Sequence, residues 1–245
     1  GGADIIVVEP DSKTASAISE KHDVAVVETV GDLDANLTPE TVVFAVKPQS
    51  MDDVAPAYGG YAGPDTVFLS IAAGRTIAYF EDKLGPEAAI VRAMPNAPAA
   101  VGRGITVAAA NGQVTGQQKS RCDGLLGTVG FVAWIDDEGL MDAVTAVSGS
   151  GPAYVFLLAE CLAEAGREAG LPAELSDQLA RATVAGAGEL LHQSGDSATR
   201  LRENVASPGG TTAAVTNSLD LYEKSQTTFS LNLLSSKPLT LNPNL

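Results

Sequence analysis

The sequence predicts a doubly wound α/β domain followed by an all-α domain, because the residue types and their hydrophobic pattern change part-way along the chain. In the first half, β-branched runs at residues 5–8, 24–27, 41–46, 67–71 and 89–94 alternate with helix-like runs at residues 12–21 and 76–84 and after Pro48. Continuous apolar strands separated by helices are typical of a parallel sheet covered on both faces. After about residue 136 the chain is rich in Ala, Leu, Glu and Gly, and we expect helices over residues 152–168, 174–193 and 197–205. We therefore divide the chain into residues 1–136 and 137–245.

The composition narrows the classes of partner. Of the 245 residues 45% are hydrophobic, which is enough to bury a sizeable core, and the net charge of -15 argues against nucleic acid and anionic membranes as partners. Cys122 and Cys161 are the two cysteines, so there is no disulfide framework, and no metal-ligand spacing occurs. No apolar run approaches the roughly 18 residues of a membrane-spanning helix, and we find no signal peptide. We expect a cytoplasmic protein that binds no metal, nucleic acid or membrane.

Three successive predicted strands end in small residues or prolines. The stretches "AVKPQ", "SIAAGRT" and "RAMPNAP" contain Lys47-Pro48, Ala72-Ala73-Gly74 and Met94-Pro95-Asn96. Ligands of open α/β sheets bind at the carboxyl ends of the strands, where small residues let the backbone approach a flat ligand. Each stretch alone fits an ordinary strand-to-helix turn. Their recurrence favours a shared binding crevice.

Glu9 closes the first predicted strand, and two interpretations of it are equally good. Its carboxylate could accept a hydrogen bond from a ribose 2′-hydroxyl, and it would repel a 2′-phosphate. Alternatively, the run from Glu9 to Ser12 forms only a turn and a helix cap.

Two glycine-containing stretches of the second half predict donor-rich helix starts. In "NVASPGGTT", residues 204–212, backbone N–H groups and hydroxyls suit a carboxylate or phosphate, although a capping motif alone is the alternative. In "SGSGP", residues 148–152, two extra glycines predict that a ligand comes close to a helix N-terminus. Residues 153–165 are apolar nearly all round, which predicts burial against a second copy of the chain. No Ser-His-Asp order, paired carboxylates or His/Cys cluster occurs, which favours hydride transfer by a cofactor.

The stretches "VVFAVKPQ", "SIAAG", "RAMPNAPAAVGRG", "MDAVTAVSGSGPAYVF" and "NVASPGGTT" together resemble pyrroline-5-carboxylate reductase. The resemblance implies a Rossmann-type domain that binds NADPH or NADH and a helical domain that dimerises by interleaving. It implies hydride transfer from the nicotinamide to the C=N carbon of Δ1-pyrroline-5-carboxylate, giving L-proline. It also implies a homodimer, and leaves open whether dimers assemble further.

The resemblance also assigns roles to residues. Those that would line the cofactor crevice are Lys47, Pro48, Ala72, Ala73 and Asn96; we add the neighbouring Val46 and, from its position at a strand end, Glu9. The substrate carboxylate would be held by Ser207, Gly209, Gly210 and Thr211, and the pocket would be bordered by Thr145, Ser148 and Gly149. Thr212 would be the catalytic residue, hydrogen-bonded to the ring nitrogen.

The sequence departs from the family pattern at both ends. The family begins with a strand, a G-x-G-x-x-G-like turn and a helix, roughly 25 residues that do not precede residue 5 here. We expect that this sequence is part of a longer chain; the alternative is an impaired cofactor site. Residues 221–245 do not resemble the Ala/Glu-rich helix expected there. Two other functions therefore stay open: an inactive dimerisation module, and a related reductase that acts on another carboxylate.

Overall fold

The structure is a computed structural model that describes residues 5–206. The chain divides into two compact units, one made of Gly1–Pro95 and Ala99–Gly139, the other of Asn96–Pro98 and Leu140–Leu245. The division at Gly139 lies three residues from the expected one at residue 136. The short excursion of Asn96–Pro98 into the second unit was not foreseen.

The described strands of the first unit form two sheets. Strands β1 (Ile6–Val8) and β2 (Ala25–Val27) pair in parallel. A five-stranded sheet follows the order β3-β4-β5-β6-β7. Its strands are β3 (Thr41–Phe44), β4 (Val67–Ser70), β5 (Ala89–Met94), β6 (Gly104–Ala110) and β7 (Gly130–Trp134). Neighbours are parallel except β5 and β6, which are antiparallel.

The five strands expected from the sequence are confirmed, and the structure adds β6 and β7. In β6 the sequence "GITVAAA" has three alanines, which have little preference for strands. The composition of this run therefore does not predict a strand. The parallel run β3-β4-β5 places the ends of these three strands along one edge of the sheet. That edge is where the sequence predicted the crevice.

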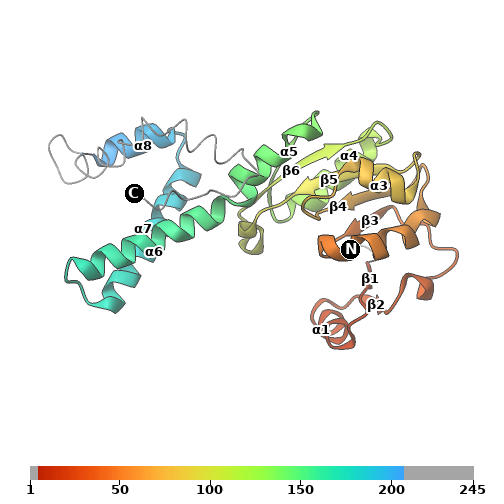
Figure 1. Ribbon diagram of the computed structural model, residues 1–245, viewed down its shortest axis with the longest axis horizontal. Coiled ribbons are helices and arrows are strands. Elements are labelled where there is room, and N and C mark those ends of the chain that lie inside the picture. Colours follow the sequence, from red (N-terminus) through yellow and green to blue (C-terminus); the bar gives the residue numbers. More distant parts are fainter. Residues whose placement is uncertain (1–4, 207–245) are drawn as a thin grey trace, which may run out of the picture. The chain divides into compact units, whose positions relative to one another are not determined.

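Helices connect and cover these strands (Figure 1). Those of the first unit are α1 (Ser12–His22), α2 (Met51–Val54), α3 (Ile77–Leu84) and α4 (Gly116–Gly127). Short 3-10 turns occur at Val30–Asp32, Pro48–Ser50, Ala55–Tyr61, Ala97–Val101 and Glu138–Leu140. Side chains cap several helix starts: Asp11 accepts from the Thr14 N–H before α1, and Thr76 from the Tyr79 N–H before α3.

The core of the first unit lies on both sides of β4 and β5. Val67, Leu69 and Val91 form one cluster with Cys122 of α4, whose burial raises the pKa of its thiol to about 11. The rings of Phe44, Phe68 and Phe80 stack with centroid separations of 6.0 Å and 5.4 Å. Apolar packing on both faces of a parallel sheet is the doubly wound arrangement that the continuous strand runs predicted.

The second unit is helical. Its elements are α5 (Met141–Val144), a π turn (Thr145–Gly149), α6 (Gly151–Glu168), α7 (Ala173–Gln193) and α8 (Ala198–Val205). The three long helices expected from the sequence are confirmed. Helices α6 and α7 lie side by side, joined by a tight turn in which the Leu171 N–H donates to the Gly166 carbonyl at 3.0 Å (Figure 1). A Cβ at Gly166 would come within 2.9 Å of Ser176 Oγ, so glycine is what allows this close approach.

Candidate functional site

The loops after β3 and β4 are neighbours, as their parallel pairing requires. The ladder between the two strands is continued by the Ile71 N–H, which donates to the Phe44 carbonyl at 3.2 Å. Beyond it, Val46 and Lys47 are exposed and Pro48 is half-buried in one loop. In the other, Ala73 is exposed, while Ala72 is buried with its N–H on Ser70 Oγ at 3.2 Å. These predicted cofactor residues therefore lie together at one edge of the sheet.

Glu9 follows β1 and makes a local turn. Its backbone N–H donates to the Val27 carbonyl at 2.9 Å, and its Oε1 accepts from the Asp11 N–H at 2.9 Å. Asp11 in turn caps α1. The turn-and-cap interpretation thus describes what one carboxylate oxygen does, and the other oxygen, Oε2, takes no part in that bond.

Asn96 is brought to the predicted substrate residues of the second unit. Its Nδ2 donates to the Ser148 carbonyl at 3.4 Å. Thr145 lies one turn earlier, and its Oγ1 donates to the Met141 carbonyl at 2.8 Å. One predicted cofactor residue therefore contacts the segment that contains Thr145, Ser148 and Gly149, which sequence spacing alone could not have told us.

The stretch "SGSGP" contains the start of α6, as expected, but a π turn directly precedes that start. It lies inside a helical run, where Ser150 has helical backbone angles (φ -85°, ψ -23°). The Ser150 N–H donates to the Thr145 carbonyl at 2.8 Å, the five-residue spacing of a π turn. Such turns are rare and frequently occur at functional sites. The backbone donors assigned to a helix N-terminus are thus partly used inside the chain.

One polar atom in this π turn has no hydrogen-bond partner among residues 5–206. Ser148 Oγ is buried and makes no hydrogen bond among the described residues. A buried hydroxyl without a partner costs about 1–3 kcal/mol, so the group needs an explanation, and a ligand or an ordered water would supply one. Next to it, a Cβ at Gly151 would meet nothing within 4 Å. The extra glycine is therefore not explained by packing against any part of the chain that the structure describes.

The predicted carboxylate-binding residues and the catalytic residue lie outside the described part of the chain. They are Ser207, Gly209, Gly210, Thr211 and Thr212. Helix α8 ends at Val205, directly before them. Among residues 5–206, no group of three or more His, Cys, Asp or Glu side chains could hold a metal ion.

Arg75 was missed by the sequence analysis. It follows Gly74, which has a left-handed backbone (φ 73°), and its guanidinium donates to the Pro48 carbonyl. The stretch "AAGRT" held the signal, since a glycine turn at a strand end followed by arginine can direct a cation across the edge of the sheet.

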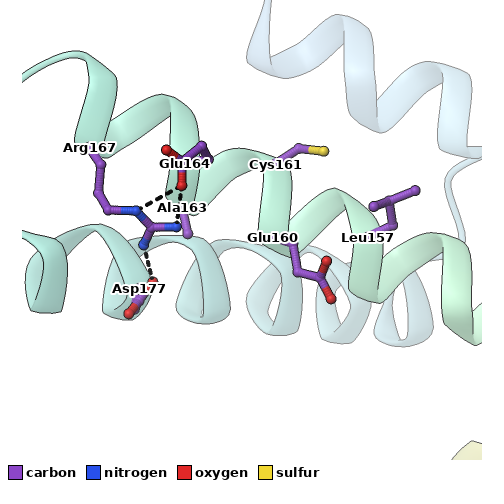
Figure 2. A pocket seen from close by; sticks show the side chains of 7 residues that line it. All are labelled: Leu157, Glu160, Cys161, Ala163, Glu164, Arg167 and Asp177. Carbon is purple, nitrogen blue, oxygen red and sulfur yellow. Dashed lines mark hydrogen bonds and ion pairs between the residues drawn. The ribbon is translucent and has the colours of Figure 1, made fainter.

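A hollow lies elsewhere, on the pair α6–α7. It has a volume of about 440 Å³ and an acidic rim, in which Arg167 contacts Glu164 and Asp177 at 2.7 Å each (Figure 2). Its lining residues are Leu157, Glu160, Cys161, Ala163, Glu164, Arg167 and Asp177. None of the predicted site residues is among them, so this hollow is not the predicted site.

Helix α6 exposes an apolar surface. Phe156, Leu157 and Leu158 are 60%, 56% and 53% exposed, and Ala163 is the buried residue of the helix. The helical stretch Glu138–Glu168 is long and apolar enough to cross a membrane by length and composition alone. The expectation that no such stretch exists was wrong, because the π turn joins α5 and α6 into one helical run.

Comparison with known proteins accounts for the motifs and for this surface. Residues 138–230 match the family model for pyrroline-5-carboxylate reductase dimerisation. The pyrroline-5-carboxylate reductase of Pseudomonas aeruginosa is 39% identical over 216 residues, covering 88% of this chain and 78% of the relative. The chain belongs to the pyrroline-5-carboxylate reductase family. The Synechocystis member is 41% identical over 211 residues, covering 86% and 77%.

Solved structures of the family have the same fold. The pyrroline-5-carboxylate reductase of Coxiella burnetii superposes with a TM-score of 0.84 at 33% identity, covering 94% of this chain and 84% of that one. The Plasmodium falciparum enzyme, solved with NADP bound, gives 0.74 at 30% identity and covers 94% and 82%. The Rossmann-type sheet followed by a helical dimerisation domain is thus the fold of this chain.

The strand-end loops of the first unit fit a flat dinucleotide. Lys47 and Ala73 are exposed, and a Cβ at Gly74 would meet nothing within 4 Å, so the edge is open. A lysine there also suits an anionic ligand. A glycine-rich turn that would cradle the pyrophosphate is not found among residues 5–206.

Proposed function

We propose that the chain reduces Δ1-pyrroline-5-carboxylate to L-proline with NADPH or NADH. The observation that carries the proposal is the relationship to named pyrroline-5-carboxylate reductases at 39% and 41% identity over most of the chain. The contact between Asn96 and Ser148 supports it, because it joins a cofactor motif to a substrate motif.

The reaction needs a hydride at the imine carbon and a proton at the ring nitrogen. The bound cofactor supplies the hydride. Because the imine can bind as its protonated iminium form, the chain needs no strong acid. Thr212 Oγ1 accepts a hydrogen bond from the iminium N–H and so fixes the face of the ring that is attacked. Positioning of this kind can supply much of the rate.

The substrate carboxylate is held by neutral donors. The hydroxyls of Ser207 and Thr211 and the backbone N–H groups of Gly209 and Gly210 can bind an anion without a cation. Thr145, Ser148 and Gly149 border the same pocket in this proposal. Ser148 Oγ is buried and has no partner among the described residues, so its hydroxyl could serve the ring or a bound water.

The residues that would hold the cofactor are Val46, Lys47, Pro48, Ala72, Ala73 and Asn96. Glu9 favours NADH over NADPH, since Oε2 can accept from a ribose 2′-hydroxyl while the carboxylate repels a 2′-phosphate. The Plasmodium falciparum relative was solved with NADP bound, so both cofactors are included in the test below.

The working form is a homodimer built through α6 and its neighbours, and these dimers can assemble further. The protein works in the cytoplasm. Cys122 is buried and Cys161 exposed, and both are free, as expected in a reducing compartment.

The test is oxidation of NADH and NADPH by the purified protein with pyrroline-5-carboxylate at neutral pH, beside a Thr212→Ala variant. We expect turnover in the wild type and a loss of at least about tenfold in kcat/KM in the variant, since one hydrogen bond to a charged group is worth about 1.5–3 kcal/mol. A folded dimer without turnover, whose melting temperature cofactor does not raise, would instead favour the inactive module. A preference for another cyclic imine would favour the related reductase.

A further inference from the structure

The Arg75 guanidinium connects the two strand-end loops of the first unit. Its Nε and Nη2 both donate to the Pro48 carbonyl oxygen, at 3.0 Å and 2.6 Å. Nη2 also lies 3.1 Å from Asp52 Oδ2, at the start of α2. One side chain from the loop after β4 thus holds the loop after β3 through Pro48 and the start of α2 through Asp52.

Tyr79 of α3 fixes the guanidinium in place. The guanidinium carbon lies 4.6 Å from the centre of the Tyr79 ring, a cation–π geometry. The Tyr79 hydroxyl donates to Asp52 Oδ1 at 2.9 Å, and this bond, together with Arg75, holds the pKa of the Asp52 carboxyl below its usual range. The guanidinium therefore has a carbonyl, a carboxylate and a ring around it. A planar cation with fixed donors suits such a setting better than an ammonium does.

The cluster of Arg75, Asp52 and Tyr79 lies beside the two loops of the predicted cofactor site and affects the distance between them. The β3–β4 ladder extends to the bond between Ile71 and Phe44. Beyond that bond the loops carry Lys47 and Ala73, both exposed, and the described link between them is Arg75. The distance between the two loops sets the width of the edge on which a dinucleotide would lie.

We propose that Arg75 is a positioning residue for the nicotinamide cofactor. It holds the Lys47-Pro48 loop against the Ala72-Ala73 loop and presets their spacing before the cofactor binds. The inference rests on the cofactor-binding role of these loops in the proposed function. A site whose shape is fixed in advance loses less conformational entropy on binding, so the effect of Arg75 is on cofactor affinity.

The test compares Arg75→Met with a matched arginine at another place. Arg121 of α4 also joins a carbonyl and a carboxylate: its Nη1 donates to the Glu40 carbonyl at 3.1 Å, and its Nε lies 3.3 Å from Glu40 Oε2. The two side chains are similarly exposed, 25% for Arg75 and 23% for Arg121. Glu40, however, precedes β3, at the end of the strand away from the predicted crevice.

We expect Arg75→Met to raise the Kd for NADH and NADPH by about tenfold, measured by quenching of nucleotide fluorescence without substrate. In turnover, the KM for nicotinamide cofactor should rise likewise, and the KM for pyrroline-5-carboxylate should stay within about twofold of wild type. Arg75→Lys should give an intermediate Kd, because lysine keeps the charge beside Asp52 but cannot donate from two nitrogens in one plane. Arg121→Met should bind cofactor as the wild type does.

The inference is overturned if Arg75→Met binds cofactor like the wild type, or if Arg121→Met weakens binding equally. It is also overturned if both KM values rise together, since that result indicates a general loss of structure. These results differ from failure of the proposed function, which shows as a wild type that neither binds cofactor nor reduces pyrroline-5-carboxylate.

Discussion

The carboxylate of Glu138 is expected to contribute several kcal/mol to the stability of the first unit. Glu138 Oε1 accepts from Arg92 Nη1 at 2.7 Å and from the Ile77 N–H at 2.9 Å. The Arg92 side chain, in β5, is only 8% exposed. Removing the partner of a buried charge costs about 3–5 kcal/mol, so Glu138→Ala should lower the free energy of unfolding by about that much. Urea unfolding followed by the fluorescence of Trp134, the only tryptophan, measures this in the first unit.

The control for that prediction is a solvent-exposed ion pair, that of Glu40 and Arg121. Glu40 is 75% exposed where it meets Arg121, so Glu40→Ala should cost less than about 1 kcal/mol. Glu138→Gln should lie between the two variants, because the amide oxygen can still accept both hydrogen bonds without carrying a charge. Equal effects of Glu138→Ala and Glu40→Ala would contradict the prediction.

Residue types and spacing were enough to place some site residues but not others. Lys47 and Ala73 were predicted to share an edge because parallel strands end together, and the structure places them in neighbouring loops. The contact of Asn96 with Ser148 joins residues 52 positions apart, and no local pattern encodes such a pair. The stretch "AAGRT" could have pointed to Arg75 itself, but not to its partners Pro48 and Asp52, which lie more than 20 positions away.

At the scale of elements, the close pair α6–α7 makes Gly166 sensitive to substitution. A Cβ there would lie 2.9 Å from Ser176 Oγ and 3.2 Å from Ser176 Cβ, so Gly166→Val should destabilise the helical unit by about 1–3 kcal/mol. Gly124, inside α4, has nothing within 4 Å of an added Cβ, so Gly124→Val should be close to neutral. Thermal unfolding followed by circular dichroism at 222 nm compares the two.

A second substitution checks the cause of that destabilisation. Ser176→Gly removes both atoms that the new side chain would meet, and Ser176 Oγ has no hydrogen-bond partner to lose among the described residues. The double variant should therefore recover part of the stability lost in Gly166→Val. No recovery would show that the helix pair is not held apart by this contact.

The π turn is an element that the local sequence does not predict. Ser-Gly-Ser-Gly-Pro carries the residues of a helix start, and proline at the second position of α6 fits that expectation. The chain before it is already helical, however, and one residue more per turn lets the Thr145 carbonyl accept from Ser150. Whether a glycine-rich stretch breaks a helix or bulges within it depends on what packs around it, which the sequence does not state.

At the scale of the whole chain, the order of a sheet domain and a helical domain follows from the sequence alone. The runs in β3, β4 and β5 are β-branched and continuous, and the helices after residue 150 are long and apolar. The antiparallel β6 was not predicted, because an alanine-rich strand differs little from a helix in composition. The apolar surface of α6, by contrast, was predicted to need a second copy of the chain, and the family match covers the same residues.

That surface leads to a prediction about assembly. Phe156 of α6 is 60% exposed in the single chain, and Phe131 of β7 is 68% exposed. If α6 is the dimer interface, Phe156→Glu places a charge in an apolar contact, which costs several kcal/mol, whereas Phe131→Glu leaves its charge in water. Sedimentation should therefore show Phe156→Glu as a monomer at micromolar concentration and Phe131→Glu as a dimer. A dimeric Phe156→Glu together with a monomeric Phe131→Glu would move the interface to the sheet unit, and the exposed face of α6 would then need another explanation.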